Sequence, residues 1–304
     1  MLSYAKVAHK PRTLRSLAGL SPKGFTQLAR AFERAYEAHL EAQDRQRPQP
    51  RQRRRGGGRK SAIPTIEDKL LFILFYFRLY PLQEVQGFLF GMSQPQANFW
   101  IHRLAPILNQ ALGYEMQLPA REPAALEQVL EACPGLAFII DGTERPIQRP
   151  KDPQRQRQYY SGKKKRHTVK NILITSKRTG KIKGLSPTME GKKHDKKLAD
   201  ETGFRFPAGS KLWKDSGFQG YEPPGVETFQ PRKKLQGREL TAEEKEQNRA
   251  ISRVRIRVEH AIGGAKVFRI VRDVYRNRKQ NFEDLVMETA CGLHNFRLDY
   301  PLAA

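Results

Sequence analysis

The sequence is short of cysteine, of long apolar runs and of acidic side chains. Its only two cysteines, Cys133 and Cys291, are too few for a disulfide framework and suit a reducing compartment. The most apolar run, residues 70–79, is interrupted by Arg78 and is too short to cross a bilayer. The N-terminal residues also lack the apolar core of a signal peptide. We therefore expect a soluble, intracellular protein with no membrane partner.

Acidic side chains are scarce relative to basic ones. The chain carries 56 Lys and Arg against 31 Asp and Glu, which gives a formal net charge of +25. No folded core requires such an excess, and the partner that it fits is a polyanion, most commonly nucleic acid. RNA binding fits the charge equally well, but the sequence shows no aromatic sheet platform or other RNA-binding module.

The first part of the chain predicts helices separated by a basic linker. Ser21 and Pro22 begin a helix over residues 21–43, for which a packing role is favoured over DNA reading. Residues 45–60 contain eight Arg or Lys, two Pro and three consecutive Gly, which predicts a flexible linker. The predicted organisation is an N-terminal helical segment (1–44), this linker (45–60), an all-α DNA-binding domain (61–115), an α/β domain (134–275) and a C-terminal helix (276–304).

Residues 65–112 predict a compact group of three helices. Thr65 begins the first helix and Pro81 begins the second. The third begins near Gln94, after a Gly-containing turn at 91–93, so the last two helices form a helix-turn-helix candidate. An ordinary helical hairpin fits the same pattern. In the DNA-reading alternative, the groove-facing side chains are Gln94, Gln96, Asn98 and His102.

The hydrophobic period changes after residue 135. Strands are predicted over 136–141, 167–176, 181–189 and 210–215, with a short helix at 194–202 and a long helix from Thr241. This order indicates a mixed sheet flanked by helices. The first and last of these strands end on Asp141 and Asp215, and strand ends in such sheets lie near the crevice where ligands bind.

The long helix supplies a third acid, Glu259. At 100° per residue, Arg255, Glu259 and Lys266 fall within about 40° of one another at the edge of the apolar arc. Three acids that converge need a cation, and an all-oxygen ligand set suits Mg²⁺ or Mn²⁺ rather than Zn²⁺. Two such ions about 4 Å apart would activate a water or a 3′-hydroxyl and stabilise the leaving oxygen. An Asp at a strand end is also commonly a capping residue. The three acids therefore indicate a metal site only in combination with their surroundings.

Those surroundings are strongly basic. Residues 145–197 contain 18 Lys and Arg and three acids, a net charge of +15. A basic patch beside a carboxylate site is suited to neutralising phosphates. The densest part of the patch supplies the predicted DNA-binding side chains Lys163, Lys164, Lys165, Arg166 and Lys170.

Taken together, these segments resemble a DDE transposase of a bacterial insertion sequence. The resemblance is closest to the insertion sequence five family and extends more distantly to Harbinger-like elements. Residues 58–101 resemble the helix-turn-helix of the family, and "IDGTERPIQRP" with "YSGKKKRHTVK", "LWKDSGFQGY" and "RVRIRVEHAIGGAKVFR" resemble its three catalytic segments. The family pattern Y-(2)-R-(3)-E-(6)-K is matched by Arg255, Glu259 and Lys266, whereas Ser252 stands in place of the Tyr.

The resemblance implies an RNase H-like, mixed-sheet catalytic domain preceded by the all-α helix-turn-helix domain. It implies that Asp141, Asp215 and Glu259 are catalytic and bind two Mg²⁺ ions, for which Mn²⁺ can substitute. Arg255 and Lys266 would hold the phosphate backbone. Asp195, in "GKKHD", competes with Asp215 as the second ligand. Asp215 is preferred because it ends a strand beside the first, whereas Asp195 opens a helix and is more simply an N-cap.

The implied partner is double-stranded DNA, both transposon ends and target. Cutting two ends in one event suggests a homodimer or a larger assembly on DNA, in the cytoplasm and associated with the bacterial nucleoid. Two alternatives stay open: an RNase H-like DNA endonuclease without strand transfer, and a domesticated DNA-binding protein without catalysis.

Overall fold

The computed structural model describes residues 1–49, 61–234 and 239–301, and the chain divides into two compact units. Most of the linker predicted over 45–60 lies outside the described residues. We call the first unit the helical unit; it comprises Met1–Leu118, Val267–Ile270 and Leu285–Ala304. We call the second the sheet unit; it comprises Pro119–Lys266 and Val271–Asp284.

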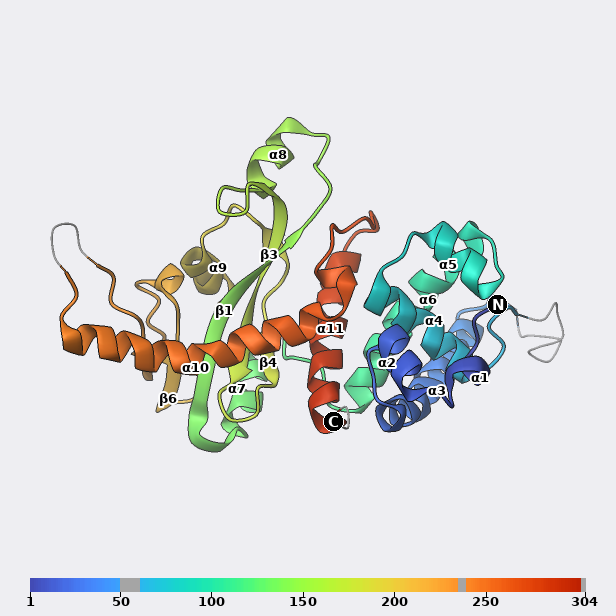
Figure 1. Ribbon diagram of the computed structural model, residues 1–304, viewed down its shortest axis with the longest axis horizontal. Coiled ribbons are helices and arrows are strands. Elements are labelled where there is room, and N and C mark those ends of the chain that lie inside the picture. Colours follow the sequence, from blue (N-terminus) through green and yellow to red (C-terminus); the bar gives the residue numbers. More distant parts are fainter. Residues whose placement is uncertain (50–60, 235–238, 302–304) are drawn as a thin grey trace. The chain divides into compact units, whose positions relative to one another are not determined.

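The helical unit contains the predicted helices (Figure 1). Their bounds are α1 Tyr4–Val7, α2 Pro11–Ala18, α3 Pro22–Arg45, α4 Ile66–Leu79, α5 Gln83–Phe90 and α6 Gln94–Tyr114, with the greater part of α11 Phe282–Asp299. Two predicted helix starts are confirmed, because the side chains of Ser21 and Thr65 accept hydrogen bonds from the backbone NH groups three residues later. The helix expected to open at Pro81 instead begins at Gln83.

Helices α5 and α6 are joined by a tight turn whose residues explain its geometry. Gly91 ends α5 in the left-handed region, at φ 70°, where glycine has no steric penalty. Ser93 and Gln96 then form a capping box at the start of α6. Helix α4 is buried along almost its whole length and forms the centre against which the pair packs.

Helix α11 supplies the rest of the helical core. A Cβ atom on Gly292 would lie 2.9 Å from Leu118 Cδ2, so this glycine permits close packing. Asn295 Nδ2 donates a hydrogen bond to Gln117 O at 2.8 Å. Residues 285–299 of the predicted C-terminal helix are therefore an integral part of this unit.

The sheet unit is built on a mixed sheet with strand order β2-β3-β1-β6-β7, with β4 and β5 also paired to β3. Strand β1 is antiparallel to β3 and parallel to β6, and β6 is parallel to β7. The strands are β1 Ala137–Pro146, β2 Tyr160–Ser161, β3 Arg166–Ser176, β4 Ile182–Leu185, β5 Met189–Glu190, β6 Ser210–Trp213 and β7 Val226–Phe229. The helices are α7 Pro123–Glu131, α8 Pro153–Tyr159, α9 Asp195–Thr202 and α10 Ala242–Lys266, with short 3₁₀ turns at Pro134–Leu136, Ser216–Phe218 and Arg269–Val271.

Helices cover both faces of this sheet, as the RNase H-like, mixed-sheet prediction requires. Helix α10 runs across the strands in Figure 1 and packs Val258 against Ile139 and Trp213. On the other face, Leu126 of α7 and Leu198 of α9 join a larger cluster. The apolar residues of β1 alternate between the two clusters because successive side chains of a strand point to opposite faces.

The prediction that the first strand ends on Asp141 is wrong. Strand β1 continues to Pro146, and Asp141 lies opposite Leu173 in the antiparallel ladder with β3. The long partner strand supplies backbone hydrogen bonds beyond the acid and so keeps the chain extended. The parallel pairing with β6 does stop earlier, at Ile139 opposite Trp213. No helix of the described residues is long and apolar enough to cross a membrane.

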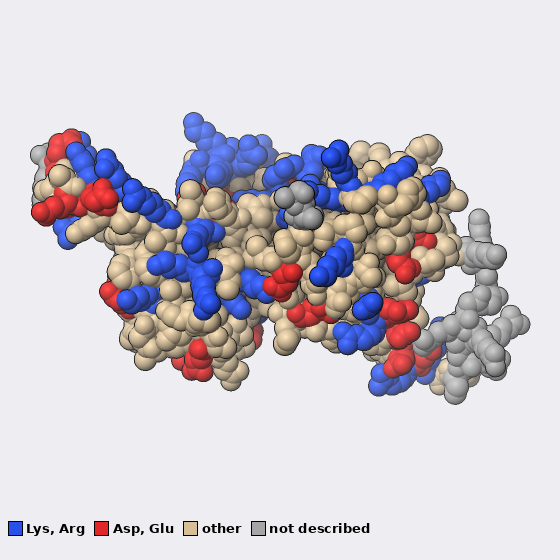
Figure 2. Space-filling model, turned by 60° about the horizontal axis from the view of Figure 1, so that its bottom comes forward, with Lys and Arg blue, Asp and Glu red and all other residues tan. Residues whose placement is uncertain are grey.

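The excess of basic side chains is visible at the surface. Lys and Arg outnumber Asp and Glu over most of the face that Figure 2 shows. The acidic side chains on this face form a few separate groups between them. The surface therefore suits a polyanionic partner, in line with the formal net charge of +25.

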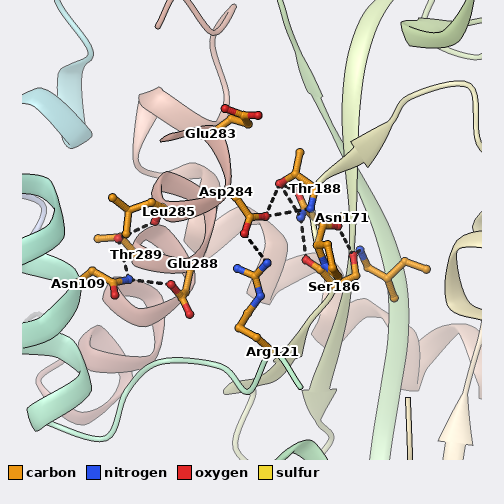
Figure 3. Close-up of polar contacts among 12 residues, drawn as sticks. Asn109, Arg121, Asn171, Ser186, Thr188, Glu283, Asp284, Leu285, Glu288 and Thr289 are labelled. Carbon is orange, nitrogen blue, oxygen red and sulfur yellow. Dashed lines mark hydrogen bonds and ion pairs between the residues drawn. The ribbon is translucent and has the colours of Figure 1, made fainter. Parts of the chain in front are cut away.

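A polar network fixes the start of α11 within the sheet unit (Figure 3). Asp284 accepts hydrogen bonds from the backbone NH and the hydroxyl of Thr188, at 2.9 and 2.7 Å, and forms an ion pair with Arg121. Asn171 of β3 donates to Ser186 O, and the buried Arg145 of β1 donates to Asn171 Oδ1. These hydrogen bonds link α11 to strands β1 and β3 in one arrangement.

Candidate active site

Asp141 and Asp215 come together because β1 and β6 are parallel and in register. Ile139 lies opposite Trp213 in the last pair of the ladder. Each acid lies two residues beyond this pair: Asp215 lies past the end of β6, which stops at Trp213, short of the predicted strand end, whereas Asp141 lies within β1 just past the point where the parallel pairing stops. The sequence predicted this pair, and the register explains it.

The two carboxylates share one arrangement. Asp141 Oδ1 accepts a hydrogen bond from Gly142 N at 2.8 Å, and Asp215 Oδ1 accepts one from Gly217 N at 2.5 Å. Their Oδ2 atoms face a common cation, Arg255 Nη2 of α10, at 3.9 Å for Asp141 and 3.7 Å for Asp215. In each residue the backbone therefore holds one oxygen and leaves the other for a positive charge.

The environment of Asp141 makes its charge costly. Burial raises its pKa to about 6, Arg255 opposes the rise, and the neighbouring carboxylates of Asp215 and Asp195 add to it. A carboxyl group in such surroundings favours either a proton or a cation. The site therefore has the electrostatic character of one that gains from binding a positive ion.

Glu259 and Lys266 lie on α10 with Arg255, as predicted. The glycines at 263 and 264 do not end the helix, which continues to Lys266. Lys266 Nζ donates to Glu144 O at 3.3 Å. Burial lowers the pKa of Lys266, with Lys164 and Arg145 acting in the same direction and Asp141 opposing it. Lys266 therefore lies close to the carboxylate site.

The fit of these residues to a metal ion is partial. Asp141 and Asp215 present free oxygens to one point, which is the donor chemistry that Mg²⁺ prefers. Glu259 is exposed, one helical turn beyond Arg255. Among the described residues, no three His, Cys, Asp or Glu side chains are grouped so that they could hold a metal ion. The two aspartates thus fit, whereas the role of Glu259 stays a prediction.

Asp195 belongs to this site by position. It is the first residue of α9; the N-cap position is occupied by His194, so the N-cap prediction for Asp195 is wrong. Its carboxylate lies against Gly142 and Gly217, the residues whose NH groups bind Asp141 and Asp215. The sequence favoured Asp215 over Asp195 because Asp195 opens a helix, and nothing in the sequence shows that α9 begins beside Gly142 and Gly217.

Lys170 differs from the other predicted DNA-binding residues of its segment. It lies on β3 opposite Glu144 of β1 and is buried. Its Nζ is 2.9 Å from Asp195 Oδ1 and 3.7 Å from Glu144 Oε1, and it donates to Lys193 O. These contacts engage the Lys170 ammonium inside the unit.

Lys163, Lys164, Lys165 and Arg166, by contrast, are exposed. The three lysines lie in the turn between β2 and β3, with Lys165 at φ 51°, and Arg166 begins β3. The influence of Lys164 on the pKa of Lys266 places this turn near the carboxylate site. The four side chains are free to neutralise phosphates there.

The predicted groove-facing residues are bonded within the helix-turn-helix. Gln94 Nε2 and Asn98 Nδ2 both donate to Gln83 Oε1 of α5, at 2.8 and 3.0 Å. Gln96 is exposed, but its Oε1 accepts from Ser93 N in the capping box. His102 is partly buried. Gln83 was not anticipated, because a polar residue at the start of a helix gives no sign of its partner.

Ser252, which replaces the family Tyr, is exposed on α10. It lines an open hollow on the outer surface of the helix with Lys245, Arg249, Arg253 and Ile256. The hollow is separate from the carboxylate pair, which faces Arg255.

This fold and site define a nuclease-like class: a helix-turn-helix in one unit and, in the other, paired acids where the parallel pairing of two strands stops. Comparison with known families agrees. Residues 63–113 match the helix-turn-helix of DDE superfamily endonuclease, and residues 140–295 match the DDE superfamily endonuclease model. The chain belongs to the DDE superfamily of endonucleases.

Two curated relatives are transposases by description. The chain is 31% identical over 241 residues to a probable transposase for insertion sequence element IS702 of Microchaete diplosiphon, covering 79% of this chain and 83% of the relative. It is 26% identical over 267 residues to a putative transposase for insertion sequence element IS112 of Streptomyces albus G, covering 88% of each. No solved structure matches the chain.

Proposed function

We propose that the protein is the transposase of an insertion sequence: it binds the ends of the element, cleaves DNA there and joins the freed ends to target DNA. The observation that carries the proposal is the convergence of Asp141 Oδ2 and Asp215 Oδ2 on one cation, Arg255, just beyond the point where the parallel pairing of β1 and β6 stops. Membership of the DDE superfamily and the two transposase relatives support it.

The proposed ligand set is Asp141, Asp215 and Glu259, holding two Mg²⁺ ions that Mn²⁺ can replace. When bound, such ions activate the attacking oxygen and stabilise the leaving one. In the first step a water oxygen attacks the phosphorus, and the bond to the 3′ oxygen breaks and leaves a 3′-hydroxyl. In the second step that hydroxyl attacks a phosphodiester of the target, and the displaced target 3′ oxygen leaves with a proton.

The basic residues around the site have distinct parts in this scheme. Arg255, now between the two aspartates, and Lys266 beside them would hold the phosphates near the scissile bond. The exposed side chains of Lys163, Lys164, Lys165 and Arg166 would bind the backbone further out. The helix-turn-helix would select the ends of the element. Acting on two ends calls for a homodimer or a larger assembly on double-stranded DNA.

The test is a cleavage and joining assay with linear DNA that carries the ends of the element, in Mg²⁺ and in Mn²⁺. Asp141→Ala and Glu259→Gln should abolish both products and leave DNA binding near normal, because they remove a proposed ligand rather than a phosphate contact. Lys266→Ala should cleave partially and bind more weakly, with a salt dependence reduced by about one phosphate. Asp200→Ala, an exposed acid paired with Lys196, is the matched control.

The outcomes separate the alternatives. Cleavage without joined product would support an endonuclease without strand transfer. Binding of end DNA with no cleavage by the unaltered protein would support a non-catalytic DNA-binding protein. Normal cleavage by Asp141→Ala would remove this residue from the site, and an active Glu259→Gln beside an inactive, normally binding Lys266→Ala would reverse the roles on α10.

A further inference from the structure

Asp195 lies between Gly142 of strand β1 and Gly217 of the 3₁₀ turn Ser216–Phe218, next to the two proposed ligands. A Cβ atom on Gly142 would lie 2.9 Å from Asp195 Oδ1, and one on Gly217 would lie 2.9 Å from Asp195 Oδ2. Distances below 3.0 Å are not found between a real Cβ and a neighbour, so neither position accepts a side chain while Asp195 stays in place. One oxygen of Asp195 therefore lies against β1 at Gly142, and the other lies against the 3₁₀ turn at Gly217.

Those two glycines are also the residues that orient the catalytic carboxylates. Gly142 N donates to Asp141 Oδ1, and Gly217 N donates to Asp215 Oδ1. A shift of either backbone would turn the corresponding Oδ2 away from the shared cation position. Asp195 thus contacts the glycine backbone that orients the carboxylates of both proposed ligands.

Lys170 fixes Asp195 in this position. Its ammonium forms an ion pair with Asp195 Oδ1 at 2.9 Å and a longer one with Glu144 Oε1 at 3.7 Å. It also donates a hydrogen bond to Lys193 O at 2.9 Å. Lys170 is 7% exposed, on a strand that is buried along nearly all its length. A buried cation with one hydrogen bond and two ion pairs keeps one position, and so does the carboxylate with which it pairs.

We propose that Asp195 is a positioning residue of this site. Held by Lys170, it fills the space behind Gly142 and Gly217 and fixes the position of β1 relative to the 3₁₀ turn, so that Asp141 Oδ2 and Asp215 Oδ2 converge on one ion. It is not itself a ligand. The proposal rests on the metal-dependent function proposed above, and it gives the "GKKHD" segment and the buried Lys170 one joint role.

The experiment measures Mn²⁺ binding to the full-length protein without DNA, by electron paramagnetic resonance of the free ion. Asp195→Ala should weaken Mn²⁺ affinity about tenfold or more, the usual cost of removing a group that orients a ligand. Asp141→Ala should remove the binding that this site provides. The control is Glu201→Ala, a change on the same helix as Asp195, α9, that removes an ion pair of 2.6 Å with Lys193. It should leave the Mn²⁺ affinity unchanged.

A double-mutant cycle then tests the contact with the glycine. Gly142→Ala should displace the Asp195 carboxylate and weaken Mn²⁺ binding in its own right. Both changes disturb one contact. The double variant Gly142→Ala/Asp195→Ala should therefore bind Mn²⁺ no more weakly than whichever single variant has the lower Mn²⁺ affinity. Independent, multiplying losses would overturn the proposal, as would normal Mn²⁺ binding by Asp195→Ala.

Two further outcomes keep the result decisive. If Asp195→Ala fails to fold, Asp195→Asn keeps the volume and loses only the charge that attracts Lys170; it should bind Mn²⁺ more weakly than the unaltered protein. A loss of binding by Asp195→Ala as complete as that of Asp141→Ala would make Asp195 a ligand and overturn the positioning role. If Asp141→Ala binds Mn²⁺ normally, the proposed metal function fails, whereas normal binding by Asp195→Ala alone defeats only this inference.

Discussion

At the scale of single residues, burial makes the charged form of Asp141 unfavourable, and a bound cation would offset this free-energy cost. Its side chain is largely buried beside a second carboxylate, and burial is the main cause of its raised pKa. Arg255 offsets part of the cost from 3.9 Å. A buried like-charge pair is unfavourable for stability and favourable for function, which is common at sites that bind metal ions.

The raised pKa of Asp141 predicts a pH-dependent stability in the absence of metal. A folded pKa of about 6, above the ordinary value, means that the native state binds the proton more tightly than the unfolded chain does. The resulting stabilisation is complete below about pH 4 and is lost as the pH rises through about 6. In Asp141→Asn the side chain stays neutral, so this loss is absent.

The measurement is urea unfolding of both proteins in EDTA between pH 4 and pH 7. Relative to the unaltered protein, Asp141→Asn should gain up to about 3 kcal/mol in free energy of unfolding over this range, since each pKa unit is worth about 1.4 kcal/mol. A difference between the two proteins that does not change with pH would show that Asp141 is not desolvated in the native site.

At the scale of elements, features that depend on neighbours in sequence could be predicted better than features that depend on long-range strand pairing. The starts of α3, α4 and α6 were predictable because Ser21, Thr65 and the turn before Gln94 act through neighbours in sequence. Strand β7 was missed because Val226–Phe229 follows a Pro-rich stretch and gains its strand character from pairing with β6. The extension of β1 beyond Asp141 has the same cause, a partner strand that the sequence does not reveal.

The residues of the candidate site show the same difference between local signals and long-range pairing. Asp141 and Asp215 could be picked out as candidates because each comes shortly after a run of buried apolar residues. The burial of Lys170 could not, since it depends on the register that sets Lys170 opposite Glu144 and on the place where α9 begins. A lysine within a basic run is ordinarily exposed, so composition favoured the wrong environment for it.

Helices α5 and α6 give a prediction about DNA selection. Gln83→Ala removes the acceptor that holds Gln94 and Asn98 together, so both side chains lose their orientation. Base contacts specify and phosphate contacts position, so the preference for element-end DNA over random DNA should fall about fivefold or more, with little change in affinity for random DNA.

Competition binding with end DNA and shuffled DNA measures this preference. Gln110→Ala, further along α6, is the control and should keep it, because Gln110 bonds only to the nearby Tyr114 hydroxyl among the contacts described. Equal weakening on both DNAs would mean that the α5–α6 contact supports the fold and does not orient groups that read bases. Gln96 is a poorer choice for this test, because its removal also breaks the capping box.

At the scale of the whole molecule, the helical unit is assembled from the two ends of the chain. Residues 1–118 supply the helix-turn-helix, and residues 285–304 supply most of α11. Asn109 of α6 donates to Glu288 and Thr289 of α11, as Figure 3 shows, and Asn295 bonds to Gln117 O. A fragment that stops after α6 would therefore lack part of its own core.

This assembly predicts that a change near the C-terminus damages DNA selection at the other end of the chain. Phe296 is fully buried in the helical unit and packs against the tilted ring of Tyr300. Phe296→Ala should destabilise this unit by about 3–5 kcal/mol, which is a large part of the stability of an ordinary domain. Hydrogen exchange should then accelerate in peptides from residues 63–113, and preference for end DNA should fall. Leu298→Ala, 43% exposed on the same helix, should change neither. Fast exchange confined to α11 in Phe296→Ala would show that the helix-turn-helix folds without it.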